Sequence, residues 1–274
     1  MCWAAAQSSG DVHVDDSVDP IRVEMTSRFG FYDFLGYIIP GAILLLALTY
    51  WAESVLKFDL VTVGSISDVG QTTLFLIVAY LVGHLMQAFG RQLEKREAKS
   101  WGGYFSVQFL RPDDTFYTQD FKKRLLHAIR EAFGLTPLVD PPDNKTRDRR
   151  LQEMFDVCYT YVIQRGIGQH AEIHNATYGF FRGALVLWLV VIPLFFVAVL
   201  RHASIAVASA LDYNQTPFDE VKWHLTVAGM AALLAGVTYP LLRERFQHFG
   251  RRFVDAVYRS FFVSVSSGGL SRQS

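Results

Sequence analysis

Four long apolar stretches constrain the fold of this chain more than any other feature of its sequence. They run over 32–51, 72–89, 183–200 and 225–242. At a rise of about 1.5 Å per residue, each would form a helix about 27–30 Å long, which matches the hydrocarbon core of a bilayer. The sequence therefore predicts an all-α membrane protein, with four transmembrane helices arranged as two hairpins around a helical cytosolic domain.

Lysine and arginine are distributed unevenly around these stretches. The first loop between apolar stretches contains Lys57 and the second contains Arg201 and Lys222, while the other cations, out of 26 in the chain, lie elsewhere. Short cytoplasmic segments of membrane proteins are enriched in Lys and Arg. We therefore expect a multi-pass protein whose two termini and central region are cytoplasmic and whose two hairpin loops lie outside.

The same pattern divides the chain into five parts. An acidic arm over 1–30 is expected to be mobile, because it has few apolar residues to bury. Transmembrane hairpins are predicted over 31–90 and 178–242, with the cytosolic domain between them over 91–177. The last part, 243–274, is predicted to be a basic amphipathic tail. It would be a solvated extension, a lipid-facing helix or a helix that joins subunits.

The central region shows the periodicity of amphipathic helices. Thr118 is a good N-cap for a first helix that should end at Gly134. A second helix is predicted after Thr146, and a last one from about Gln169 should run directly into the third apolar stretch. The segment 101–114 is expected to be irregular, with one short strand. The apolar face of the second helix is formed by Leu151, Met154, Phe155, Cys158 and Val162.

One polar stripe interrupts the second apolar stretch. Its residues are Tyr80, His84, Gln87 and Arg91. Their spacing of i, i+4, i+7 and i+11 places them on one helical face. Two interpretations stay open: the stripe lines a water-filled pore, or it forms hydrogen bonds to other helices of the same subunit. In the first case, replacing His84 or Gln87 by Leu should reduce conduction directly.

Small residues mark two sites of helix packing. In the first apolar stretch, Gly36, Pro40 and Gly41 permit close approach and a bend, which is either an ordinary kink or a hinge. The fourth stretch carries small residues at every fourth position, which lets membrane helices approach closely within or between subunits. These residues are Ala228, Ala232 and Gly236.

Clusters of cations lie outside the apolar stretches, and we consider them candidates for contacts with an anionic ligand or with lipid. They are Lys145, Arg147, Arg149 and Arg150, with Lys122, Lys123 and Arg124 before them, and Arg243, Arg245, Arg251 and Arg252 after the fourth stretch. Guanidinium groups bind phosphate bidentately, so a nucleotide or oligonucleotide would suit them. The alternative is that these cations are solvated and only set the topology.

No motif indicates an enzyme. The chain has no Walker A sequence, no GxSxG and no GxGxxG between a strand and a helix. His170 and His174 occur as HAEIH, which lacks the HExxH order of a zinc protease. We therefore predict no catalytic residue, no metal and no cofactor. A transporter is also disfavoured, because no apolar stretch carries Asp, Glu, Lys or Arg in its middle.

Two short blocks carry a resemblance to known proteins. They are FYDFLGYIIPG at 31–41 and YGFFRG at 178–183. Together with the order of two spans, helical domain and two spans, they resemble small bacterial inner-membrane proteins. Among these are membrane effectors of anti-phage defence systems of the Hailong type.

The resemblance implies a homo-oligomeric ion channel of the bacterial inner membrane. A nucleotide-derived signal, made by a neighbouring enzyme, would control the channel, and the channel would depolarise the cell in abortive infection. A membrane anchor or scaffold for a cytosolic partner, which conducts nothing, is the alternative, and a small transporter is the third candidate.

Overall fold

The computed structural model describes residues 33–56, 69–137, 143–213 and 218–270, and all its regular elements in these ranges are helical. In chain order they are η1 Phe34–Ile38, α3 Ile39–Trp51, η2 Ala52–Leu56, α4 Val69–Ser100, α5 Phe105–Gln108, α6 Gln119–Phe133, α7 Asn144–Gln164, α8 Gln169–Tyr213 and α9 Phe218–Leu270. The predicted all-α fold is confirmed. The strand expected in 101–114 is wrong, since a short helix occupies this segment. The acidic arm over 1–30 and Lys57 lie outside the described residues.

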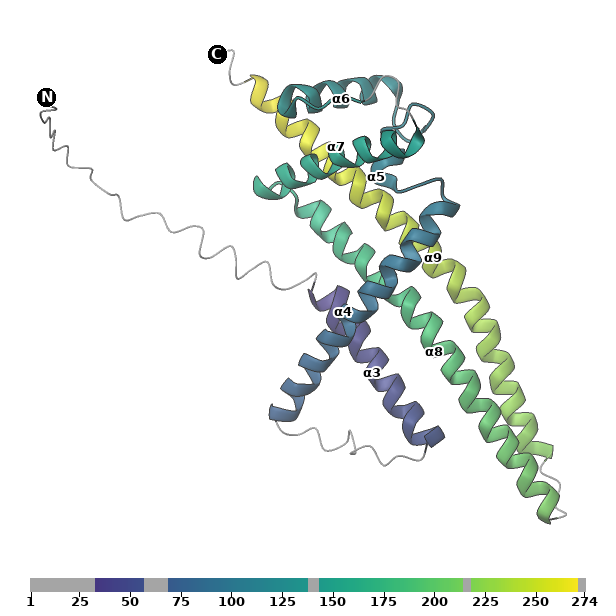
Figure 1. Ribbon diagram of the computed structural model, residues 1–274. Helices are drawn as coiled ribbons and strands as arrows, with labels where there is room; N and C mark the ends of the chain where they lie inside the picture. The colour runs from purple at the N-terminus through teal and green to yellow at the C-terminus, as the bar shows by residue number, and fades with distance from the viewer. Residues whose placement is uncertain (1–32, 57–68, 138–142, 214–217, 271–274) are drawn as a thin grey trace, which may run out of the picture.

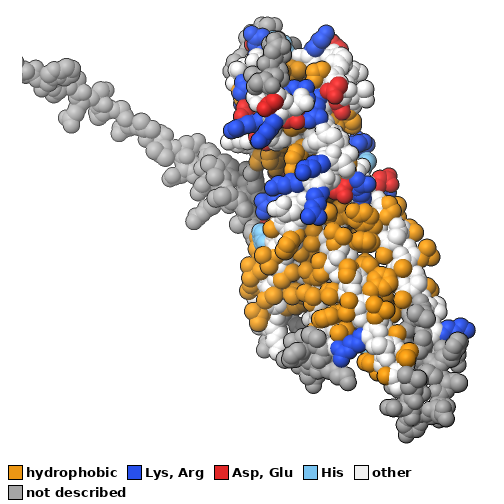
Figure 2. Space-filling view, turned by 45° about the vertical axis from the view of Figure 1, so that its right-hand side comes forward, with side chains coloured by type: hydrophobic (Ala, Val, Ile, Leu, Met, Phe, Trp, Pro, Cys, Tyr) orange, Lys and Arg blue, Asp and Glu red, His pale blue; other side chains and the backbone are white. Residues whose placement is uncertain are grey.

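Four of the described helical segments are long and apolar enough to cross a membrane, so this is a multi-pass membrane protein. They are η1 with α3, α4, α8 and α9. Figure 1 shows α8 and α9 side by side along much of their length, and α3 and α4 crossing each other. Figure 2 shows a broad hydrophobic band over these helices, with charged side chains gathered above it.

Three of these helices are longer than a bilayer is thick. With 32, 45 and 53 residues, α4, α8 and α9 extend over about 48, 68 and 80 Å. They leave the apolar zone as unbroken helices, even though Pro193 and Pro240 lie inside α8 and α9. We call the apolar zone the spanning bundle. The head consists of α5, α6 and α7 with the ends of α4, α8 and α9 that pack on them (Figure 1).

Local capping explains where the head helices begin and end. The Thr118 side chain accepts a hydrogen bond from the Phe121 N–H at the start of α6, and Gly134 ends α6 with φ of 68°. Both predicted ends of this helix are confirmed. Helix α7 begins earlier than predicted, because the Asp143 carboxylate accepts a hydrogen bond from the Thr146 N–H. The apolar face predicted for α7 is buried, as expected.

The C-terminal part of α9 lies at the centre of the head core. This core includes the buried residues Leu125, Ile129, Met154, Cys158, Val257, Tyr258 and Phe261. Phe246 stacks on Tyr178 at 4.6 Å, and Phe253 meets Phe155 edge to face at 5.9 Å between ring centroids. The segment predicted to be a tail over 243–274 is therefore part of a continuous helix that packs into the head as far as Leu270, where α9 ends. Its apolar face pairs with helices of the same chain, so it is neither a solvated nor a lipid-facing extension.

Two polar side chains are also built into the head. The Tyr117 hydroxyl donates a hydrogen bond to Asp255 at 2.8 Å, and burial together with the Asp255 charge raises the pKa of Tyr117. Lys122 is 2% exposed and donates to the carbonyls of Arg111 and Asp114. Lys122 is therefore not part of a basic surface, which corrects its place among the surface cations.

The spanning bundle depends on close backbone contact between α3 and α4. A Cβ atom added to Gly41 would lie 1.9 Å from the Ala79 carbonyl oxygen, and one added to Gly83 would lie 2.1 Å from the Tyr37 carbonyl oxygen. The close packing expected at Gly41 is thus present. By contrast, a Cβ atom on Gly236 would meet no atom within 4 Å. The small-residue face of α9 is open there.

Candidate functional site

Gln87 joins three segments at the end of the spanning bundle nearest the head. Its side chain is 3% exposed. The amide nitrogen donates hydrogen bonds to the carbonyls of Gly36, at 2.6 Å, and Gly179, at 2.9 Å. The amide oxygen accepts a hydrogen bond from Arg182 Nε at 2.8 Å. All the hydrogen-bonding atoms of this amide therefore connect α4 to η1 and to α8.

The residues around Gln87 explain how it reaches these carbonyls. Pro40 has no N–H, so it cannot form the usual i to i−4 helical bond to the Gly36 carbonyl, which accepts from Gln87 instead. Gly183 lets α8 approach closely, since a Cβ atom there would lie 3.1 Å from Pro40 Cγ. The two sequence blocks at 31–41 and 178–183 thus meet at one side chain of α4.

Arg182 extends this contact toward the head. Its Nη1 pairs with Glu94 Oε2 at 2.8 Å, and the Tyr178 hydroxyl donates to Glu94 Oε1, also at 2.8 Å. Gly90 makes room for the arginine, because a Cβ atom there would lie 2.7 Å from Arg182 Cγ. The Arg182 and Glu94 side chains are 13% and 15% exposed, so water screens this ion pair only partly.

A second ion pair joins α4 to α9 one helical turn further on. Arg243 Nε lies 2.6 Å from Glu97 Oε2, and Arg243 Nη2 donates to Ser100 at 3.0 Å. The Tyr239 hydroxyl donates to Glu97 at 3.4 Å. We call the whole group the polar junction. It consists of Gln87, Glu94, Glu97, Tyr178, Arg182 and Arg243.

The predicted stripe on α4 is divided between two environments. The ring of His84 stacks on that of Tyr37 at 4.1 Å, and Tyr80 packs against both rings. Together with Gln87 these contacts favour the interpretation that the stripe joins helices of one subunit. Arg91 is exposed and belongs to none of these contacts.

Most of the predicted cations on α7 have carboxylate neighbours. Arg149 and Arg150 approach Glu153 at 3.7 and 3.1 Å, and Arg147 lies 3.7 Å from Asp148. Lys145 is exposed. The cluster is therefore less positive than its sequence indicates.

The predicted cations of α9 do not form one cluster either. Arg243 belongs to the polar junction, and the guanidinium of Arg251 lies 5.2 Å from the centre of the Phe105 ring. Arg245 and Arg252 are exposed.

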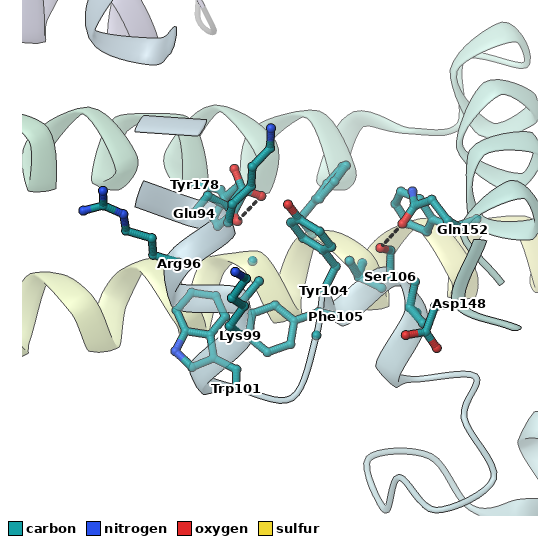
Figure 3. A pocket seen from close by; sticks show the side chains of 18 of the residues that line it. Glu94, Arg96, Lys99, Trp101, Tyr104, Phe105, Ser106, Asp148, Gln152 and Tyr178 are labelled. Atoms are coloured by element: carbon teal, nitrogen blue, oxygen red, sulfur yellow. Dashed lines mark hydrogen bonds between the residues drawn. The ribbon is translucent and has the colours of Figure 1, made fainter. Parts of the chain in front are cut away.

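A cavity of about 1360 Å³ opens in the head next to the polar junction. Its walls come from α4, α5, α7, α8 and α9 and from the segment between α4 and α5. Figure 3 shows Tyr104 between the bonded pairs Glu94–Tyr178 and Ser106–Gln152. The sequence does not indicate this cavity, because the residues of its walls are far apart in the chain.

The ion pairs of the polar junction were also missed. Glu94 continues the spacing of the predicted stripe, at i+14 from Tyr80, and Arg182 is a cation at the edge of an apolar stretch. These two signals were present, but nothing in them specifies that Glu94 pairs with Arg182.

No family model matches the chain, and the comparisons with curated proteins and with solved structures also give no match. The function is therefore inferred from the geometry and from the resemblance of the two sequence blocks.

Proposed function

We propose that this protein is an oligomeric channel of the inner membrane whose conduction is controlled by its head. The polar junction carries this proposal. It lies where three continuous helices pass from the spanning bundle into the head, so a rearrangement of the head must act on α4, α8 and α9 together.

The chemistry of the junction suits a switch with two arrangements. Removing charges from water is costly. A protein in which apolar residues replace a shielded ion pair is therefore often as stable as the original, or more stable. The Glu94–Arg182 pair therefore suggests a role other than stability alone. A ligand or partner that binds one arrangement more tightly than the other would shift the population between them.

An oligomer follows from the number of helices. Four helices that pack on one another leave no space for a water-filled path, so a channel requires several copies. The outward surface of α9 supplies candidate contacts, since Leu233 is 70% exposed and a Cβ atom added to Gly236 would meet no atom of another segment within 4 Å. Lipid tails or a second copy would cover this surface.

The biological role that fits this proposal is the one implied by the resemblance. A nucleotide-derived signal from a neighbouring enzyme would reach the head and change conduction. Depolarisation of a bacterial cell during phage infection would follow. Cytoplasmic termini would place the head on the side where such a signal is made.

Ion flux through vesicles tests the proposal. The full-length protein is reconstituted into liposomes with a potassium gradient, and a potential-sensitive dye reports the flux. Glu97→Gln removes the pair with Arg243 between α4 and α9, and we expect it to change the flux about fivefold or more. The control is Glu131→Gln, because Glu131 approaches only His127 of its own helix, at 3.9 Å.

The two outcomes separate the candidate functions. Flux that responds to Glu97→Gln and not to Glu131→Gln supports a channel controlled through the junction. Vesicles that remain tight with the wild type and both variants would indicate a membrane anchor that conducts nothing. Mass photometry of the detergent-purified protein provides the second measurement, since a strict monomer is incompatible with the proposed channel.

A further inference from the structure

We infer that the cavity in the head is a binding site for a phosphate ester that also carries a flat or apolar group. The site differs from the predicted cluster on α7, because most of its cations come from the extension of α4. Its cationic residues are Lys95, Arg96, Lys99, Lys145 and Arg149.

The charge balance of the cavity favours an anion. Two carboxylates, Glu94 and Asp148, also line it, but each already has a cationic partner. Glu94 is paired with Arg182, and Asp148 with Arg111 at 2.5 Å. In the described part of the chain, no carboxylate lies within ion-pair distance of the α4 cations or Lys145. Arg149 lies 3.7 Å from Glu153, but the cavity lining as a whole still carries an excess of cations over carboxylates.

The inner wall offers a surface for a flat or apolar group. The rings of Trp101 and Phe105 are stacked at 5.2 Å with an interplanar angle of 10°, and Phe155 and Phe253 also line the cavity. Tyr104 is 41% exposed and lies between the two ends of the cavity in Figure 3. Aromatic faces bind flat groups by stacking and aliphatic groups by burial. A bare phosphate would leave this wall unused.

The size and position of the cavity are compatible with two sources of the phosphate ester. Its volume of about 1360 Å³ exceeds the range of about 300–1,000 Å³ of most small-molecule sites. Gln92, the first cavity residue of α4, follows the apolar stretch by less than one helical turn. Both a soluble ester and the headgroup of an anionic lipid can therefore reach the cations.

Binding here would act directly on the polar junction. Glu94 and Tyr178 line the cavity and are hydrogen-bonded to each other. A ligand that forms a hydrogen bond with either side chain would therefore change the ion pair between Glu94 and Arg182. This consequence for flux rests on the proposed function, but binding itself does not.

The test measures binding to the full-length protein in detergent by isothermal titration calorimetry. The probes are adenosine triphosphate, dihexanoyl phosphatidylglycerol and inorganic phosphate. We expect one of the two esters to bind at least about tenfold more tightly than inorganic phosphate, because only the esters use the aromatic wall. Preference for the nucleotide indicates a soluble ligand, and preference for the lipid indicates a headgroup.

Two variants test the assignment of the site. Lys95→Gln with Lys99→Gln should weaken binding of the preferred ester by about tenfold for each cation removed. Its control, Lys123→Gln with Arg130→Gln, makes the same change in charge on exposed residues of α6 outside the cavity. Tyr104→Ala should weaken binding of the ester about tenfold and leave inorganic phosphate unaffected.

The inference is overturned if neither ester binds more tightly than inorganic phosphate, or if the α4 double variant and the α6 control lose equal affinity. Calorimetry does not depend on conduction. An ester that binds in a protein without flux therefore refutes the channel and keeps the site, whereas flux without ester binding refutes the site alone.

Discussion

The head and the spanning bundle are held together in different ways. Large apolar side chains from α6, α7 and α9 fill the head core and exclude water. In the bundle the buried cluster is small, with Leu44, Met86 and Val186, and the tightest contact is between backbones at Gly41 and Gly83. Apolar burial stabilises a fold in water, but it provides no driving force between helices that lipid already surrounds. Close contact and hydrogen bonds take its place there.

The polar groups follow the same division. Ion pairs within the head helices lie largely at the surface, such as Arg124 with Asp120, and such pairs contribute little to stability. In the bundle, the Gln87 amide is buried and fully bonded. A polar group in this environment specifies which helices meet, because leaving it unpaired is costly.

The largest effect is expected when a substitution leaves an empty space in the apolar core of the head. Leu125 is fully buried on α6, so Leu125→Ala should lower the free energy of unfolding of the head by about 2–5 kcal/mol. Thermal unfolding in detergent, followed by near-UV circular dichroism, measures this loss. Lys123→Ala, at an exposed position of the same helix, should change it by less than about 0.5 kcal/mol. A loss as small as that of the control would mean that apolar burial does not stabilise the head.

The second-largest loss of stability is expected when the backbone contact between α3 and α4 is disturbed. Gly41→Ala places a Cβ atom against the Ala79 carbonyl, so α3 and α4 must separate, at a cost of about 1–3 kcal/mol. Titration with a denaturing detergent, followed by helix content, measures the change in bundle stability. Gly236→Ala makes the same replacement in another spanning helix where no atom is near. Equal stability of the two variants would remove the proposed difference between the regions.

The smallest effect concerns pH and the cap of α7. Hydrogen bonds from Thr146 hold the pKa of Asp143 below its ordinary value of 3.8. A carboxyl group with a lowered pKa in the folded state stabilises the protein above its unfolded pKa, and this contribution is lost as pH falls through the folded pKa. Asp143→Asn keeps a capping oxygen but does not titrate, so its head should lose less stability below about pH 4 than the wild type.

Unfolding midpoints between about pH 3 and 6 measure this difference. Asp113→Asn is the control, because Asp113 is exposed and caps no helix. Parallel pH profiles for the wild type and Asp143→Asn would show that ionisation of the Asp143 carboxyl group does not contribute to the stability of the head. The bundle should be unaffected in either case.

Local pattern was sufficient for much of the fold. The lengths of the apolar stretches predicted four spanning helices, and Thr118 and Gly134 predicted both ends of α6. The face of α7 that includes Met154 and Cys158 was also predicted, and burial raises the pKa of the Cys158 thiol to about 12, as suits an inert core residue. Each of these features depends on neighbours within a few turns of one helix, which the sequence displays directly.

The sequence by itself determined which faces are apolar and which positions are polar, and the tertiary structure decided which of them meet. The phenylalanines of α9 were visible as a periodic face, yet their partners on α7 lie about a hundred residues away. Likewise, the stripe at Gln87 was compatible with a wet pore and with a helix interface. The hydrogen bonds that Gln87 donates to the Gly36 and Gly179 carbonyls favour the helix interface. Periodicity is a local property, whereas the pairing of faces depends on how distant helices pack.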